Sequence, residues 1–136
     1  MAAISITPGS VLMVAGGSKR TVTSGGTITA GMCVYEDTAT STWKPARANA
    51  AATSAASAIA LCGASSGQQM VIQEAGSITI GGTVVAGIVY CVSDAVAGEI
   101  IPSADYGSGD YPAVIGVASS TSVIQLGFIA PGAVRV

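Results

Sequence analysis

The sequence GASSG at residues 63–67 has the spacing of a serine nucleophile motif, G-x-S-x-G, in which a sharp turn between a strand and a helix exposes the serine hydroxyl. Such a serine needs a neighbouring base, normally histidine, to take its proton, and the chain contains no histidine. Lys19 and Lys44 are the alternative bases for a serine–lysine pair, but no motif places either of them beside residues 63–67. The stretch is therefore predicted to be a turn between two strands, and we expect no enzymatic activity.

The three cysteines, Cys33, Cys62 and Cys91, are widely spaced along the chain. No two of them form a C-x-x-C motif, and without histidine they do not complete a zinc ligand set. Because unpaired cysteine behaves as a small apolar residue, we predict three reduced and buried side chains. A disulfide between Cys33 and Cys91 is the alternative, since both residues lie in a phrase that the chain repeats.

Four acidic residues crowd the second half of the chain: Asp94, Glu99, Asp105 and Asp110. Carboxylates of this kind bind Ca²⁺ when several of them converge with loop carbonyls. The spacing in DYGSGD, residues 105–110, is not that of an EF-hand loop, and Asp beside Gly is common in ordinary turns. We therefore expect no metal and no cofactor, and a calcium site in these loops is the alternative.

Composition argues against binding to nucleic acid and against crossing a membrane. The chain of 136 residues is long enough for one compact domain or two small repeated lobes. It is 50 % hydrophobic and only 9 % charged, against a usual charged share of about 25 %. Its basic residues form no run and its net charge is −2, which gives no field to attract nucleic acid. The uncharged residues 75–93 alternate polar and apolar side chains around two glycines, which predicts strands and a turn rather than a membrane-spanning helix. A protein this poor in charge is expected to cover part of its surface with a partner.

The chain repeats a short phrase, first as GGTITAG and then as GGTVVAG. Three pairs of similar segments occur in the same order in the two halves: residues 25–31 and 81–87, residues 64–66 and 118–120, and residues 71–73 and 123–125. The conserved order predicts a duplicated strand–turn unit, residues 25–76 and 81–132 approximately. Both units are expected to lie in a single β-domain of residues 19–136.

Turn residues recur about every eight to twelve positions, a spacing typical of all-β folds. We therefore predict an all-β protein, a small antiparallel β-barrel or β-sandwich built from the two units. The segment Ile88–Val92 is apolar on both faces, so it is buried on both sides or meets another subunit with one face. The Ala-rich residues 46–61 predict an irregular or partly helical connection into a strand near residues 58–64.

The N-terminal residues 1–18 contain Pro8 and Gly9 and further glycines, which predict an extended arm with a strand at Ser10–Ala15. Three aromatic residues lie in polar or glycine-rich surroundings, and Tyr and Trp favour interfaces that are partly apolar and partly wet. The alternative is that these aromatics cover an end of the barrel. The candidate interface residues are the apolar residues of the arm and these aromatics: Ile4, Ile6, Val11, Met13, Trp43, Tyr106 and Tyr111.

A series of turn and strand patterns runs through the second half: GQ, a glycine-flanked strand pair, AG-x-x-Y-x-VS, G-x-I-x-P, D-x-x-SGDY and IGVA. They lie at Gly67-Gln68, Gly76–Gly81, Ala86–Ser93, Gly98–Pro102, Asp105–Tyr111 and Ile115–Ala118. Together they resemble the capsid decoration (cement) proteins of tailed bacteriophages. Ala30–Tyr35 and Trp43–Ala46 in the first half are similar but looser, so the resemblance covers about residues 20–130.

The resemblance implies a virion structural protein, made in the host cytoplasm, that binds the outer surface of the phage head and stabilises the shell. It also implies the major capsid protein as partner and a homotrimeric state, with no nucleic acid and no membrane. The alternatives are a head-fibre or tail-associated virion protein and a carbohydrate-binding or enzymatic β-domain. The arm of residues 1–18 would add a strand to a capsid sheet, so its removal is expected to weaken shell binding and leave the domain folded.

Overall fold

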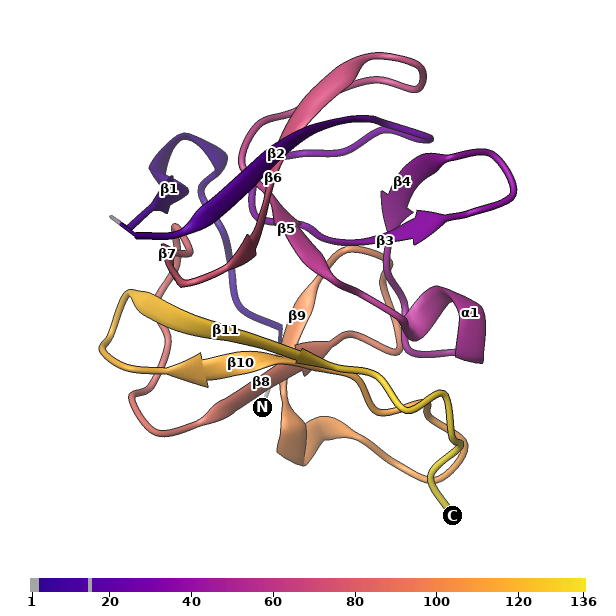
Figure 1. Ribbon diagram of the computed structural model, residues 1–136. Coiled ribbons are helices and arrows are strands. Elements are labelled where there is room, and N and C mark those ends of the chain that lie inside the picture. The colour runs from indigo at the N-terminus through magenta and orange to yellow at the C-terminus, as the bar shows by residue number, and fades with distance from the viewer. Residues whose placement is uncertain (1–2, 15) are drawn as a thin grey trace.

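The computed structural model describes residues 3–14 and 16–136, which form two antiparallel sheets and very little helix (Figure 1). The N-terminal sheet has the order β2-β6-β5-β3-β4, with β2 at Ser18–Thr23, β3 at Cys33–Asp37, β4 at Thr42–Pro45, β5 at Ala58–Ala60 and β6 at Gln69–Ala75. The C-terminal sheet has the order β1-β7-β11-β10-β8-β9, with β1 at Leu12–Met13, β7 at Ser77–Thr79, β8 at Val89–Val92, β9 at Ile100–Pro102, β10 at Val114–Ala118 and β11 at Val123–Ile129. The helical turns are η1 at Pro8–Ser10, α1 at Ala51–Ser54 and η2 at Ser103–Asp105.

The predicted all-β antiparallel fold is confirmed, and the sandwich is the correct architecture. A closed barrel is wrong, because the strands form two separate sheets and the described ladders all run within one sheet or the other. Figure 1 shows the C-terminal sheet curving beneath the N-terminal sheet, with β9 rising behind. Sheets with one buried face stack in this way to remove apolar side chains from water.

The N-terminal sheet curls until its two edge strands meet. Ser24, just after β2, forms a single parallel bridge with Trp43 of β4, and the Gly25 amide donates to the Trp43 carbonyl at 2.7 Å. The curl encloses a small core of its own: Ile28, Val34, Trp43, Ala58, Ala60, Ala64, Met70 and Ile72. One bridge is not a ladder, so this sheet is strongly bent rather than closed.

The two sheets have the same strand order once β1 is set aside. Along the N-terminal sheet the order is β2-β6-β5-β3-β4, and along the C-terminal sheet it is β7-β11-β10-β8-β9. The repeated AG turns occupy equivalent places: the Gly31 amide donates to the Ala60 carbonyl at 2.8 Å, and the Gly87 amide donates to the Ala118 carbonyl at 2.8 Å. Both glycines have positive φ, +93° and +86°, which residues with a Cβ rarely adopt. The repeated phrase therefore builds the same turn twice.

Strand register identifies which residues of the two halves are equivalent. Ile72 lies opposite Ala60, and Ile124 lies opposite Ala118, so the VIQ segments at residues 71–73 and 123–125 are equivalent as predicted. The predicted match of the ASS segments is wrong. Ala60, whose amide donates to the Met32 carbonyl, takes the place of Ala118, because the loop after β5 is longer than the loop after β10.

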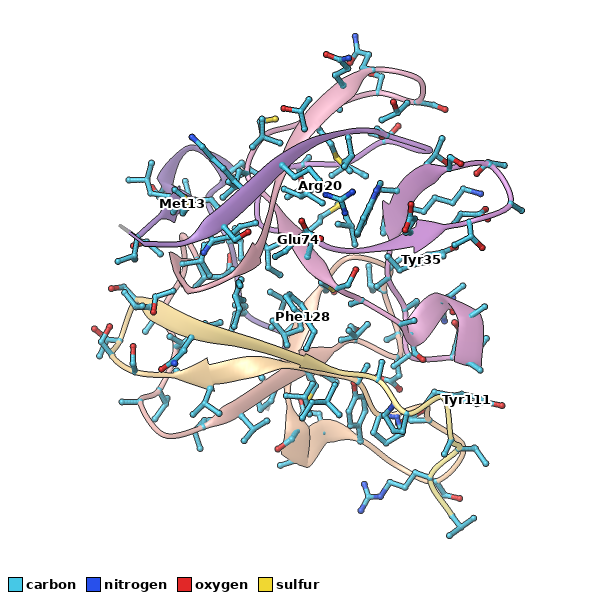
Figure 2. The ribbon with its side chains drawn as sticks, viewed as in Figure 1. Met13, Arg20, Tyr35, Glu74, Tyr111 and Phe128 are labelled. Atoms are coloured by element: carbon cyan, nitrogen blue, oxygen red, sulfur yellow. The ribbon has the colours of Figure 1, made fainter. Side chains whose placement is uncertain are left out.

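The main core lies between the two sheets. It contains Cys33 and Ile59 from the N-terminal sheet together with the inward residues of the C-terminal sheet, among them Ile78, Tyr90 and Ile124. Phe128 of β11 points from the C-terminal sheet toward the N-terminal sheet (Figure 2) and packs against this core. Strand β5 alternates cleanly, because Ile59 faces the main core while its neighbours on either side face the small core inside the curl.

Residues 3–14 lie along the domain and join the two edges of the C-terminal sheet. The Ile4 amide donates to the Ile100 carbonyl of β9 at 3.0 Å, the Thr7 amide donates to the Gly81 carbonyl at 2.8 Å, and β1 pairs with β7. Val11 is only 5 % exposed and belongs to the main core. In the N-terminal sheet the two edges are joined directly by the bridge between Ser24 and Trp43. In the C-terminal sheet the N-terminal segment lies between the corresponding edges instead. Of the strand predicted at Ser10–Ala15, Leu12–Met13 forms β1, while Ala15 lies outside the described residues.

The Ala-rich residues 46–61 contain one short helix and then a strand, as predicted. Helix α1 has no side-chain hydrogen bond at its N-terminus, and β5 follows after a short connection. Ala46, Ala48 and Ala56 are buried in the main core. Small side chains are needed here because the connection packs directly on the C-terminal sheet, where the Ala48 amide donates to the Ser93 carbonyl at 2.8 Å.

Candidate docking surface

The GASSG segment is a turn between antiparallel strands β5 and β6, as predicted. The Ser65 amide donates to Gln68 Oε1 at 2.8 Å, and Gly67, at φ +86°, donates its amide to the Ser24 carbonyl. A nucleophile motif requires a helix after the turn, whereas here the chain continues into β6. Lys44, one of the two proposed bases, is bound to Asp37 at 2.7 Å, and this contact raises the pKa of the lysine.

All three cysteines are free, so the alternative of a Cys33–Cys91 disulfide is wrong. Cys33 and Cys91 are buried as predicted, and burial raises the pKa of the Cys33 thiol to about 12 and of the Cys91 thiol to about 11. Cys62 is only half-buried, and its sulfur accepts the Val71 amide at 3.3 Å. Cys33 and Cys91 are therefore unreactive apolar groups, and Cys62 is the most accessible thiol.

The acidic residues of the second half are distributed over separate turns. Asp110 Oδ2 accepts the Gly107 amide at 2.7 Å, which closes the loop that was the candidate calcium site. Within residues 3–14 and 16–136, no group of three or more Cys, Asp or Glu side chains is arranged to hold a metal ion. In the same residues, no helix is long and apolar enough to cross a membrane.

Three of the candidate interface residues are buried inside the domain. Val11 is 5 % exposed, Trp43 3 % and Tyr106 7 %. Tyr106 donates its hydroxyl to the Val92 carbonyl at 2.5 Å and accepts the Ala113 amide at 3.3 Å, so it fastens the loop after η2 onto the C-terminal sheet. Their burial could not be read from the polar or glycine-rich sequence around them, because it depends on segments distant in the chain.

The other four candidate interface residues are partly exposed. Ile4 and Ile6 pack against the main core while keeping part of their surface in water. They also line a pocket of about 180 Å³, together with Pro8, Thr29–Met32, Gly98 and Glu99. This pocket is smaller than the usual range for small-molecule sites, roughly 300–1,000 Å³. Met13 and Tyr111 are half-buried at opposite sides of the molecule (Figure 2).

Trp43 is covered by an ion pair at the open side of the curled N-terminal sheet. Arg20 Nε and Nη2 donate to the two carboxylate oxygens of Glu74, each at 3.0 Å, and the Arg20 guanidinium lies 5.4 Å from the centre of the Trp43 ring. The Glu74 carboxylate raises the pKa of Arg20. Figure 2 shows Arg20 and Glu74 pointing toward each other from β2 and β6. We call Arg20, Glu74 and Trp43 the polar cap.

The outer face of the C-terminal sheet has exposed aliphatic side chains beside small polar ones, and its described strands carry no charge. The strands described for this sheet contain no Asp, Glu, Lys or Arg, whereas the strands of the N-terminal sheet carry Lys19, Arg20, Glu36, Asp37, Lys44 and Glu74. Val117 is 42 % exposed, Leu12 63 % and Ile129 64 %. Large aliphatic side chains left exposed on a sheet face are common on surfaces that bind another protein.

A row of three residues crosses the middle of this face. Val117 of β10 pairs with Val89 of β8 on one side and with Gln125 of β11 on the other. Val117 and Gln125 are exposed and Val89 is half-buried, while Tyr90 and Val92 point inward to the main core. We call Val89, Val117 and Gln125 the outer row. The sequence signal for it was the segment Ile88–Val92, which is apolar on both faces and predicted either burial or contact with another subunit.

The comparisons with known proteins identify no relative. The chain matches no protein-family model, no curated protein and no solved structure.

Proposed function

We propose that this protein is a virion structural protein that binds the outer surface of a tailed-phage head and stabilises the shell, as a capsid decoration protein. The observation that carries the proposal is the outer face of the C-terminal sheet, whose described strands carry no charge and which leaves Leu12, Val117 and Ile129 exposed. A surface of this kind binds another protein by burying apolar area. The resemblance of about residues 20–130 to cement proteins implies the major capsid protein as the partner.

The role is mechanical rather than chemical. Each docked face contributes a modest free energy, and a homotrimer that engages several shell subunits at once multiplies weak contacts into tight binding. Such a protein needs neither cofactor nor catalytic residues. Low charge also suits a component that must pack densely beside copies of itself, because like-charged neighbours repel.

Co-sedimentation of the purified protein with undecorated shells, expanded and unexpanded, tests the proposal. We expect saturable binding to expanded shells at a fixed ratio to the capsid subunit. The binding should change little between low and high salt, because salt screens charges and the proposed surface has none. A homotrimer is expected in sedimentation equilibrium. Failure to bind either shell would contradict the proposal and favour a head-fibre or tail-associated protein instead.

A further inference from the structure

The outer row has an exact structural counterpart in the other half of the molecule. In the N-terminal sheet, Ile59 of β5 pairs with Cys33 of β3 and with Gln73 of β6. The repeat makes these three residues equivalent to Val117, Val89 and Gln125, because Gly31 and Gly87 open the same turn and the VIQ segments hold the same register. We call Cys33, Ile59 and Gln73 the inner row.

The inner row is completely buried, with 0 % exposure at each of its three residues. Its occupant is part of the same chain: Cys33 and Ile59 belong to the main core with the inward side chains of the curved C-terminal sheet, including Ile78 and Ile124. One half of the molecule therefore shows what a row of this composition packs against. Cys33 and Ile59 pack against the inner face of a curved, aliphatic β-sheet, and the Gln73 side-chain amide donates to the Ala75 and Ser77 carbonyls at 3.0 and 2.8 Å.

A second copy of the chain has no free surface of that kind. The inner face of its C-terminal sheet already holds the inner row. The equivalent face of its N-terminal sheet is filled by its own core and closed by the polar cap. Register places the three cap residues, Arg20, Glu74 and Trp43, at the positions that Ile78, Leu126 and Ile100 take in the C-terminal sheet.

We infer that the outer row docks on the shell protein, against a curved β-sheet whose contacting face is aliphatic and uncharged, in the way that the inner row docks within the chain. This inference rests on the proposed function, since it names the surface that meets the shell. The match of charge supports the assignment: an uncharged row buried against a charged surface would strip water from charges without pairing them, which is costly. The outer row therefore selects an uncharged partner surface.

Variants of the outer row test this in the same co-sedimentation assay. Val117→Lys places an ammonium group at the centre of the row, and we expect binding to expanded shells to weaken by about tenfold or more. Gln125→Lys, at the end of the row, should weaken it in the same direction. Val117→Ile copies the inner-row residue Ile59 and is expected to keep full binding. Val96→Lys is the matched control, because Val96 is an exposed aliphatic residue, 52 % exposed, in the turn between β8 and β9.

The nature of the partner surface is tested by photo-crosslinking. A photoreactive amino acid replaces Gln125, the complex with expanded shells is irradiated, and the linked shell peptide is identified by mass spectrometry. A crosslink to a β-strand supports the inference, and a crosslink to a helix or to an extended terminal arm overturns it.

The two proposals fail in different ways. If the wild-type protein binds shells and both lysine variants bind equally well, the inference about the outer row is wrong and the proposed function stands. If the wild-type protein binds no shell, the proposed function is wrong and the inference falls with it. Thermal unfolding of each variant checks that weaker binding does not come from a misfolded protein, since all three substituted positions are at least partly exposed.

Discussion

At the scale of single residues, the main feature is a set of neutral titratable groups in the core. Cys33, Cys91 and Tyr106 are buried, and burial raises the pKa of each because the charged form loses its hydration. Tyr106 is held in addition by the Val92 carbonyl and the Ala113 amide. These groups are therefore sensitive reporters of whether the core is closed.

Stability should fall in alkaline solution. Below pH 9, the ordinary pKa of the thiol, Cys33 and Cys91 are protonated in both states. Between pH 9 and about 11 to 12 they ionise only in the unfolded chain, which favours unfolding by roughly 1.4 kcal/mol per pH unit for each thiol. Urea unfolding as a function of pH measures this slope. Cys33→Val should reduce it, and a flat profile from pH 8 to pH 11 would contradict the assignment.

Tyr106→Phe should destabilise the domain although it keeps the ring. The change removes the hydroxyl, leaving the Val92 carbonyl and the Ala113 amide without this partner in a buried place. A loss of about 1–3 kcal/mol in the free energy of unfolding is expected. Tyr111→Phe is the control, because Tyr111 is only half-buried. Equal stability of the two variants in urea would show that the hydroxyl contacts of Tyr106 contribute nothing.

At the scale of elements, the N-terminal segment has a structural role in the C-terminal sheet. The edges of the two sheets are connected in different ways. In the N-terminal sheet the edges meet through Ser24 and Trp43, whereas in the C-terminal sheet residues 3–14 lie between β7 and β9. We therefore revise the expectation that residues 1–18 are dispensable for folding.

Substitutions at two adjacent residues, one buried and one exposed, test whether this segment stabilises the fold. Val11→Ala removes a side chain that is 5 % exposed and should lower the free energy of unfolding by about 1–3 kcal/mol. Leu12→Ala removes one that is 63 % exposed and should leave stability within about 0.5 kcal/mol of the wild type. Chemical denaturation gives both values. If deletion of residues 1–14 left the midpoint unchanged, the segment would be a loose arm after all.

The sequence predicted the local elements well and the long-range packing poorly. The GGT and AG turns, the short helix in the Ala-rich stretch and the antiparallel strands follow from glycine conformations and β-branched side chains, which are local properties. The burial of Trp43 does not, because it depends on the curl of the sheet, which brings edge strand β2 beside edge strand β4 and places Arg20 over the ring. The predicted equivalence of the two ASS segments was wrong because chance identity between short segments is frequent in a chain rich in Ala and Ser. The outer row was visible only as the two-faced apolar strand at residues 88–92.

At the scale of the whole molecule, the two repeats have different surfaces although they share one topology. The N-terminal sheet carries the charged strands and the polar cap, while the C-terminal sheet is uncharged in its described strands. In proteins built of stacked repeats, terminal units carry polar outer faces that stop further stacking. The polar cap corresponds to such a terminal face.

Removing the polar cap should let molecules associate head to tail. The double variant Arg20→Ile with Glu74→Leu copies the aliphatic character of Ile78 and Leu126 and uncovers Trp43. We expect species larger than the wild type, increasing with protein concentration, in sedimentation velocity. Adding Val117→Lys should suppress them, because the outer row is the surface that would dock. Lys19→Ile, which removes a charge from the same strand β2, is the control and should not associate; association that ignores Val117→Lys would contradict the model.

The fusion of two repeats in one chain fixes the valence of the molecule. Each repeat contributes one row. The inner row is buried inside the chain, so a single chain has one row, the outer row, left for docking. Under the proposed function, a monovalent chain would occupy one site on a shell without joining two sites together. Joining neighbours, and hence resisting pressure from within, then depends on the number of chains held in one oligomer. A homotrimer would present three outer rows, and its stoichiometry rather than its affinity would determine how strongly the shell is clamped.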